Sequence, residues 1–186
     1  MENSKKNKLI NMNGLEDESY RYKMPSFIIT QMGAGNGKYT QLNNIDNISS
    51  SINHPPHIIC RYIASITGSS FTESTKQLTG WHDANTLNNL VIDYIKNLVL
   101  CPKCGIPETI PSVYGSKKNA GINLTCSACK TESKVIPKNK NVDKAIDIIV
   151  KYLVAGNTWT TTKGTLVEQE NTNNPFDNNM VNFDDI

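Results

Sequence analysis

Four cysteines carry the clearest chemical signal in the sequence. They form two Cys-x2-Cys pairs with 21 residues between the pairs, at Cys101, Cys104, Cys126 and Cys129. A two-residue spacer lets a tight turn aim both thiolates at one ion, and zinc takes four thiolates tetrahedrally. Because all four ligands come from the protein, no position remains for water, and the pattern predicts one structural zinc ion in a zinc ribbon. An iron–sulfur cluster is an alternative that suits this symmetrical spacing less well.

The second feature is the scarcity of arginine. Of the 19 basic residues in the chain, only Arg21 and Arg61 are arginines. Arg21 lies in the stretch YRYKMP, just ahead of the first apolar run, and Arg61 lies in the apolar-periodic stretch His57–Gly68. A guanidinium is planar and always charged, so it can meet several phosphate oxygens at once. Composition flags the two positions without assigning either of them a function.

The stretch GAGNGKYT, Gly33–Thr40, has the look of a phosphate-binding loop but departs from its pattern. A P-loop has four residues between its glycines and Ser or Thr after its lysine, whereas Gly33 and Gly37 enclose three residues and Tyr39 follows Lys38. We therefore expect no nucleotide to be bound by the chain in its own right. The stretch predicts the tip of a β-hairpin, whose small side chains let a partner's backbone or RNA come close.

The composition excludes several classes of protein. A net charge of +2 and a pI of about 8.2 are too mild to indicate nucleic-acid binding by themselves. No segment approaches the roughly 20 apolar residues that span a bilayer, and the N-terminus lacks the apolar region of a signal peptide. We expect a cytoplasmic or nuclear protein with no membrane partner, in a reducing compartment where cysteines bind metal. The fifth cysteine, Cys60, is interpreted as a small buried hydrophobic residue.

The elements that must position these residues follow from hydrophobic patterning, which predicts an α+β fold. A small mixed α/β domain is followed by the zinc ribbon and a terminal helix. Two strands flanking the glycine turn and one edge strand are predicted over residues 26–32, 39–44 and 75–80. Helices are predicted from Ile45 to Ile52 and over residues 57–68, 83–98 and 142–154. Asn44 or Asp46 is expected to cap the first helix, and the pair Pro55–Pro56 to end it.

The predicted organisation has five parts. A flexible N-terminus (1–19) is followed by the α/β domain (20–98) and the zinc ribbon (99–136). A C-terminal helix packed on the domain (137–155) and a disordered polar and acidic tail (156–186) complete the chain. His54 and His57 are expected at the surface or at helix ends. Lys117 and Lys118, between the cysteine pairs, either touch a phosphate backbone or form a solvated hairpin tip.

The order of these motifs resembles a known family. YRYKMP, the glycine loop, Asn-x-Pro-Pro at 53–56, an amphipathic helix and the two cysteine pairs follow one another over about residues 18–155. In this order they are similar to the N-terminal half of eukaryotic translation initiation factor 5, which is related to the beta subunit of initiation factor 2. The ribbon alone is shared with many proteins, whereas YRYKMP and Gly-Asn-Gly are more specific.

The resemblance implies a GTPase activator and not a GTPase. Such a protein stimulates GTP hydrolysis by the gamma subunit of initiation factor 2 in the pre-initiation complex on the small ribosomal subunit, coupled to start-codon recognition. The resemblance implies that Arg21 is an arginine finger acting in trans, supported by the basic residues Arg61 and Lys38. It also implies that the glycine loop approaches the initiator tRNA, through Gly33, Gly35, Asn36 and Gly37.

The sequence departs from the family pattern at several points. In a gapless alignment the family's basic residue beyond the glycine loop falls on Tyr39, and Ala34 replaces a basic residue between the first two glycines. The family's C-terminal helical-repeat domain is expected to be absent, and the acidic ending NFDDI is a weak match for a segment that binds other initiation factors. Two alternatives stay open: a non-activating binding module or competitor resembling the factor 2 beta subunit, and a zinc-ribbon nucleic-acid binder. A virus-encoded protein of this kind would act in the host cytoplasm.

Overall fold

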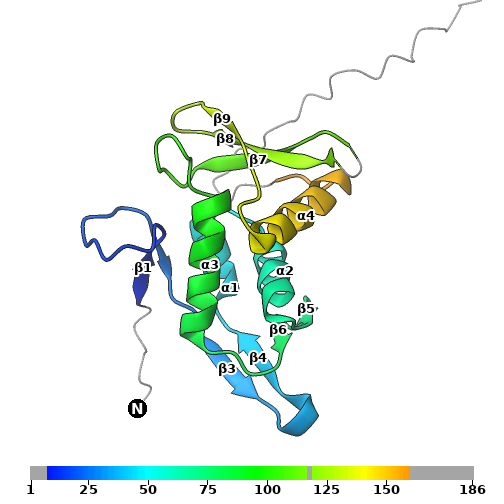
Figure 1. Ribbon diagram of the computed structural model, residues 1–186. Helices are drawn as coiled ribbons and strands as arrows, with labels where there is room; N and C mark the ends of the chain where they lie inside the picture. Colours follow the sequence, from blue (N-terminus) through cyan, green and yellow to red (C-terminus); the bar gives the residue numbers. More distant parts are fainter. Residues whose placement is uncertain (1–7, 117–118, 160–186) are drawn as a thin grey trace, which may run out of the picture.

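Four α-helices and three antiparallel sheets make up the part of the chain that the computed structural model describes, residues 8–116 and 119–159. The helices occupy the middle of the molecule, with a four-stranded sheet at one end and a three-stranded ribbon at the other (Figure 1). This arrangement confirms the predicted α+β class with a ribbon and a terminal helix. The expectations for Lys117, Lys118 and the NFDDI ending lie outside the described residues.

A short hairpin precedes the α/β domain. Strand β1, Leu9–Asn11, pairs antiparallel with β2, Lys23–Pro25, and Ile10 lies opposite Met24. Met24 is fully buried, and β2 packs against helix α1, so this hairpin belongs to the fold. The expectation of a flexible segment up to residue 19 was therefore wrong from β1 onward. A three-residue strand carries too short a pattern for its pairing to be visible in the sequence.

The four-stranded sheet contains the predicted glycine hairpin. In spatial order its strands are β3 (Ile29–Met32), β4 (Tyr39–Leu42), β6 (Gln77–Thr79) and β5 (Phe71–Thr72). A single turn of 3-10 helix, η1 at Gly35–Gly37, joins β3 to β4. The prediction that residues 75–80 form an edge strand was wrong, because β6 has neighbours on both sides and β5 is at the edge.

The four helices are α1 (Ile45–Ile52), α2 (Pro56–Thr67), α3 (Ala84–Leu98) and α4 (Lys140–Val154). Helix α1 ends where Asn53 turns into the left-handed region, with φ 59°. The proline pair does not end α1 but begins α2, because a missing N–H is harmless in a first helical turn. Asn44 stands at the start of α1 without capping it: its side chain accepts from the Ile28 N–H (2.8 Å) and donates to the Ser26 carbonyl (2.8 Å).

Helix α3 has the buried face that its apolar spacing predicts. Asp83 caps it by accepting a hydrogen bond of 2.9 Å from the Thr86 N–H. Its inward side chains are fully buried, namely Leu87, Val91, Tyr94, Ile95 and Leu98. They share one hydrophobic core with α1, α2 and α4.

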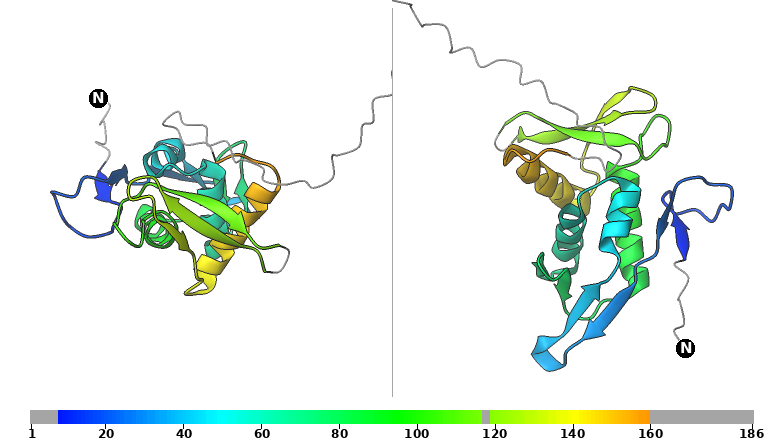
Figure 2. Two further views of the ribbon diagram at one scale, coloured as in Figure 1. Left: turned by 90° about the horizontal axis from the view of Figure 1, so that it is seen from above. Right: turned by 180° about the vertical axis from the view of Figure 1, so that it is seen from behind.

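The ribbon consists of β7, β8 and β9, paired in that order, at Thr109–Tyr114, Gly121–Cys126 and Glu132–Lys134. Figure 2 shows these strands lying across α4, which contacts both β7 and β8. Ile122 and Leu124 of β8 are buried in the same core as the helices. The ribbon is thus packed onto the domain by apolar contacts as well as by its connection to α3.

The segment after α4 returns to the core. Trp159 is 6% exposed, and its ring lies 4.6 Å from that of His54 and 5.9 Å from that of Tyr152, centroid to centroid. The prediction of a disordered tail from residue 156 was therefore wrong at Trp159. His54, expected at the surface or at a helix end, directly follows the end of α1 and is buried, at 3% exposure. Within the described ranges, no helix is both long and apolar enough to cross a bilayer.

Candidate functional site

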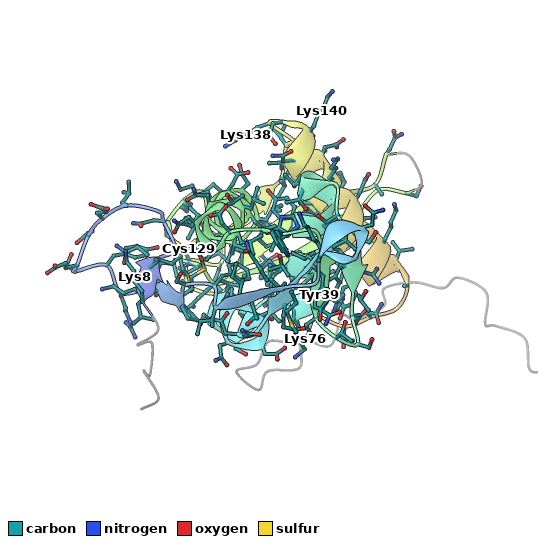
Figure 3. All side chains as sticks on the ribbon, turned by 90° about the horizontal axis from the view of Figure 1, so that it is seen from below. Lys8, Tyr39, Lys76, Cys129, Lys138 and Lys140 are labelled. Carbon is teal, nitrogen blue, oxygen red and sulfur yellow. The ribbon has the colours of Figure 1, made fainter. Side chains whose placement is uncertain are left out.

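The four cysteines converge at the junction between α3 and the ribbon. Val99 and Leu100 connect the end of α3 to Cys101, while Cys126 ends β8. Their Sγ atoms all lie within 4.8 Å of one another, with separations of 3.7 Å for Cys101–Cys129 and for Cys104–Cys126. Four sulfurs bound tetrahedrally at about 2.3 Å from a zinc-sized ion are about 3.8 Å apart. The group is therefore shaped to hold a metal ion, and Cys129 is labelled in Figure 3.

The two Cys-x2-Cys turns are built alike. In each, the N–H four residues after the first cysteine donates to that cysteine's carbonyl, from Gly105 to Cys101 (2.8 Å) and from Lys130 to Cys126 (2.9 Å). Both donors have positive φ, 70° for Gly105 and 58° for Lys130. The first cysteine of each turn also donates its own N–H, to Ile106 and Thr131, at 3.0 Å in both cases. The same pattern of backbone bonds thus shapes both Cys-x2-Cys turns.

The thiols differ in their surroundings. Cys101 and Cys126 are buried, whereas Cys104 is exposed. Hydrogen bonds from the side chain and the backbone of Thr131 lower the pKa of Cys129 to about 6, which favours the thiolate that a metal requires. Cys60 lies elsewhere, in α2, where burial raises the pKa of its thiol to about 12. The interpretation of Cys60 as a buried hydrophobic residue is confirmed.

Arg21 is exposed between two anchored tyrosines. Tyr20 and Tyr22 are half-buried, pack against the core and meet edge to face, 6.0 Å between centroids. The Met12 N–H donates to the Tyr22 carbonyl at 3.1 Å, which fixes the backbone next to Arg21. The guanidinium carbon is 5.9 Å from the centre of the Tyr22 ring, and Arg21 forms no ion pair with any described residue. Its charge is available to a partner.

Lys38 and Arg61 are already engaged within the chain. The Lys38 ammonium lies 4.2 Å from the centre of the Trp81 ring, just beyond the glycine hairpin. Arg61, on α2, lies 3.7 Å from a carboxylate oxygen of Glu73, and both side chains of this pair are more than half exposed. An ion pair this open to water is weak and can exchange partners.

The glycine hairpin, Gly33–Gly37, presents an almost bare backbone. Its residues are exposed, and added Cβ atoms on Gly35 and Gly37 would meet nothing within 4 Å. At Gly33, with φ +78°, a Cβ would overlap the Gly37 carbonyl oxygen, so this position requires glycine. The Trp81 indole N–H donates to the Met32 carbonyl (3.0 Å) beside the turn.

The structure does not gather these candidate residues into one cluster. The loop before β2, which holds Arg21, lies to one side of the helices, the η1 turn lies at the far tip of the four-stranded sheet, and the ribbon lies at the opposite end (Figures 1 and 2). Sequence reasoning missed Trp81, whose only signal was an aromatic residue in the polar stretch TGWHDAN. It also missed the buried pairing of His54 with Tyr94, at 2.8 Å between Nδ1 and Oη.

The sequence matches a protein-family model over residues 13–132, and that model describes a domain found in initiation factors 2B and 5. Among curated proteins, the chain is 34% identical to eukaryotic translation initiation factor 5 of Mus musculus over 125 residues, which is 64% of this chain and 29% of the mouse protein. It is 32% identical over 136 residues to the factor of the same name from Caenorhabditis elegans, covering 70% of this chain and 30% of the relative.

A plant protein shows the same relation. The probable eukaryotic translation initiation factor 5-2 of Arabidopsis thaliana is 34% identical over 128 residues, covering 67% of this chain and 29% of the plant protein. The chain thus spans just under a third of the length of these relatives.

Proposed function

Because this chain belongs to the family defined by the domain of initiation factors 2B and 5, we propose that it acts in translation initiation as a factor 5-like GTPase activator. It stimulates GTP hydrolysis by the gamma subunit of initiation factor 2 in the pre-initiation complex and holds no nucleotide itself. The observation that carries the proposal is the exposed, ion-pair-free Arg21, presented between two anchored tyrosines among the described residues.

The chemistry of Arg21 suits this task. Phosphoryl transfer spreads negative charge over the equatorial oxygens of the γ-phosphate, and a guanidinium can meet two of them at once. Packing of Tyr20 and Tyr22 against the core holds the backbone on both sides of Arg21. The long side chain then reaches outward from a fixed base, which limits the conformational entropy that it loses on entering another protein.

A single-turnover GTPase assay tests the role of Arg21. The release of phosphate is followed from a complex of initiation factor 2, GTP and initiator tRNA on small ribosomal subunits, with and without this chain. Removal of an arginine finger lowers the hydrolysis rate by about 10³- to 10⁵-fold, and we expect Arg21→Ala to lose a large part of the stimulation. Arg21→Lys should also be impaired, because an ammonium cannot make the paired hydrogen bonds to two oxygens that a planar guanidinium makes.

Lys134 offers a matched control for Arg21. It is also exposed and lies over a tyrosine ring, 4.2 Å from the centre of Tyr114, but on the ribbon. We expect Lys134→Ala to keep the full stimulation. If Arg21→Ala stimulates hydrolysis as well as the unaltered chain does, the finger assignment is wrong.

We further propose that the metal held by the four cysteines is zinc, in a structural role. The support is the donor set of four thiols with separations that fit tetrahedral coordination, which leaves no site for a reacting water. Metal analysis of the purified chain should give about one zinc per molecule. Iron with visible charge-transfer absorption would instead favour an iron–sulfur cluster.

The partners follow from the same proposal. They are the gamma subunit with its GTP, the small ribosomal subunit and the initiator tRNA, which the glycine hairpin approaches, and the place of action is the cytoplasm. Arg61 and Lys38 support the hydrolysis step as basic residues. Arg61 becomes free once its exposed ion pair with Glu73 opens.

A non-activating binding module is the second candidate, favoured by the family description, which names a second factor beside factor 5. Such a module would bind the same complex and leave its hydrolysis rate unchanged or lower it. The GTPase assay separates the two candidates, since stimulation by the unaltered chain is expected only of an activator.

A further inference from the structure

Trp81 is an exposed aromatic residue that the roles above do not use. It is 50% exposed, beside Met32 at 45%, in a loop that follows β6. Exposing neighbouring large apolar side chains to water is unfavourable in free energy, so a patch of them indicates a binding surface.

The loop that carries Trp81 is held rigidly on both sides. The Thr40 hydroxyl donates to the Gly80 carbonyl (2.8 Å) and accepts from the His82 N–H (2.9 Å). The Gln31 amide donates to the His82 carbonyl (2.9 Å), and the indole N–H is bound to Met32. These bonds join the loop to β3 and β4, so the indole is a preformed platform rather than a loose side chain.

The charge beside this platform is positive. Lys38 lies over the ring and is the only charged side chain in the sequence from residue 26 to residue 45. The nearest carboxylate along the chain, that of Asp83, is turned to Thr86, which donates to both of its oxygens. The charge in contact with the indole is therefore that of an ammonium.

From these contacts we propose that Trp81 and Lys38 bind one unpaired nucleotide of an RNA strand. The base stacks on the indole, and the ammonium moves from the ring to the adjacent phosphate. The bare backbone of the glycine hairpin lets the sugar–phosphate chain pass close by. Stacking of this kind is sequence-tolerant because every base offers a flat face. The choice of RNA rests on the proposed function, which sets the hairpin beside initiator tRNA, whereas the stacking site follows from Trp81 and Lys38 themselves.

Binding of a fluorescent single-stranded oligouridine to the full chain tests the site. Trp81→Ser should weaken binding by about 5- to 150-fold, the usual effect of losing one stacked base, while Trp81→Phe should retain most of it. Lys38→Gln should reduce the dependence of log K on log salt by about 0.7, the value for one phosphate contact on a single strand. The thermal midpoints of these variants should match that of the unaltered chain.

Lys134→Gln is again the matched control, since Lys134 also lies 4.2 Å from the centre of an aromatic ring. Equal losses from Lys134→Gln and Lys38→Gln would overturn the site, as would unchanged affinity in Trp81→Ser or no binding by the unaltered chain. Tighter binding of the matching deoxyoligonucleotide would overturn the choice of RNA. The GTPase assay with Arg21→Ala gives a separate answer, so either proposal can fail without the other.

Discussion

His54 and Tyr94 share a hydrogen bond of 2.8 Å between Nδ1 and Oη in the centre of the domain. His54 is 3% exposed and Tyr94 is 1% exposed, and Trp159 closes over the imidazole from the end of the described chain. The Ser49 hydroxyl donates to the His54 carbonyl, so side chain and backbone are both fixed. Burial lowers the pKa of His54 to about 3.

This pKa predicts a loss of stability in mild acid. Folded His54 stays neutral, whereas the unfolded chain binds a proton below about pH 6.5, so acid favours unfolding. From about pH 6.5 down towards pH 3, His54 should lower the free energy of unfolding by up to about 1.4 kcal/mol per pH unit. Urea unfolding measured from about pH 7.5 to pH 5, with zinc present, checks this range. His54→Asn keeps a polar group in place of Nδ1 and does not titrate, so equal pH dependence in both proteins would contradict the prediction.

The two tryptophans should differ sharply in their contribution to stability. Trp159→Ala leaves a cavity beside His54 and Tyr152, and we expect it to lower the free energy of unfolding by about 2 to 4 kcal/mol. Trp81→Ala removes a half-exposed ring and should change it by about 0.5 kcal/mol or less. Denaturant unfolding of the two variants measures the difference. Similar losses would mean that the 155–159 segment does not pack on the core.

Removal of a metal ligand should unfold the ribbon, while removal of the fifth cysteine should not. Cys126→Ser or a strong chelator leaves the remaining thiols without their ion, and small metal domains depend on that binding energy to fold. Far-ultraviolet circular dichroism and metal content report the loss. Cys60→Ala should keep about one metal ion per chain even if its buried position makes it less stable. Loss of metal in Cys60→Ala would contradict the ligand set.

The three hairpin glycines should tolerate alanine in a fixed order. Gly33→Ala should be the most damaging, since its φ is positive and the new Cβ would overlap the Gly37 carbonyl. Gly35→Ala, with φ +54° and open space around it, should cost about 1 kcal/mol. Gly37→Ala should be nearly neutral because neither obstacle is present. Thermal unfolding ranks the three variants, and a larger loss at Gly37 than at Gly33 would contradict the turn geometry.

Sequence patterns predicted the elements whose signal is local. The apolar spacing of α3 and the Cys-x2-Cys pairs each lie within a short window, and both appear in the structure as expected. The glycine hairpin was also visible, because its glycines fall between two apolar runs.

Features that depend on distant contacts were not predictable in this way. Strands β1 and β2 pair across the eleven residues 12–22, a largely polar segment that looks like a free terminus in the sequence. His54 is a polar residue beside a proline pair, and only the arrival of α3 and Trp159 makes its surroundings apolar. Trp81 depends in the same way on a strand from another part of the chain. Pairwise patterns along the sequence do not contain such contacts.

One core runs without a break from α1 to the ribbon strand β8, through Ile122 and Leu124. The α/β domain and the ribbon share this hydrophobic core, so unfolding of either part alone would expose apolar side chains of the other to water. We therefore expect their deepest amide protons to exchange with solvent at one common rate, set by a single global opening. The supply of metal in the cell would then govern how long the entire molecule survives, including the loop that holds Arg21 and the glycine hairpin, which lie far from the cysteines.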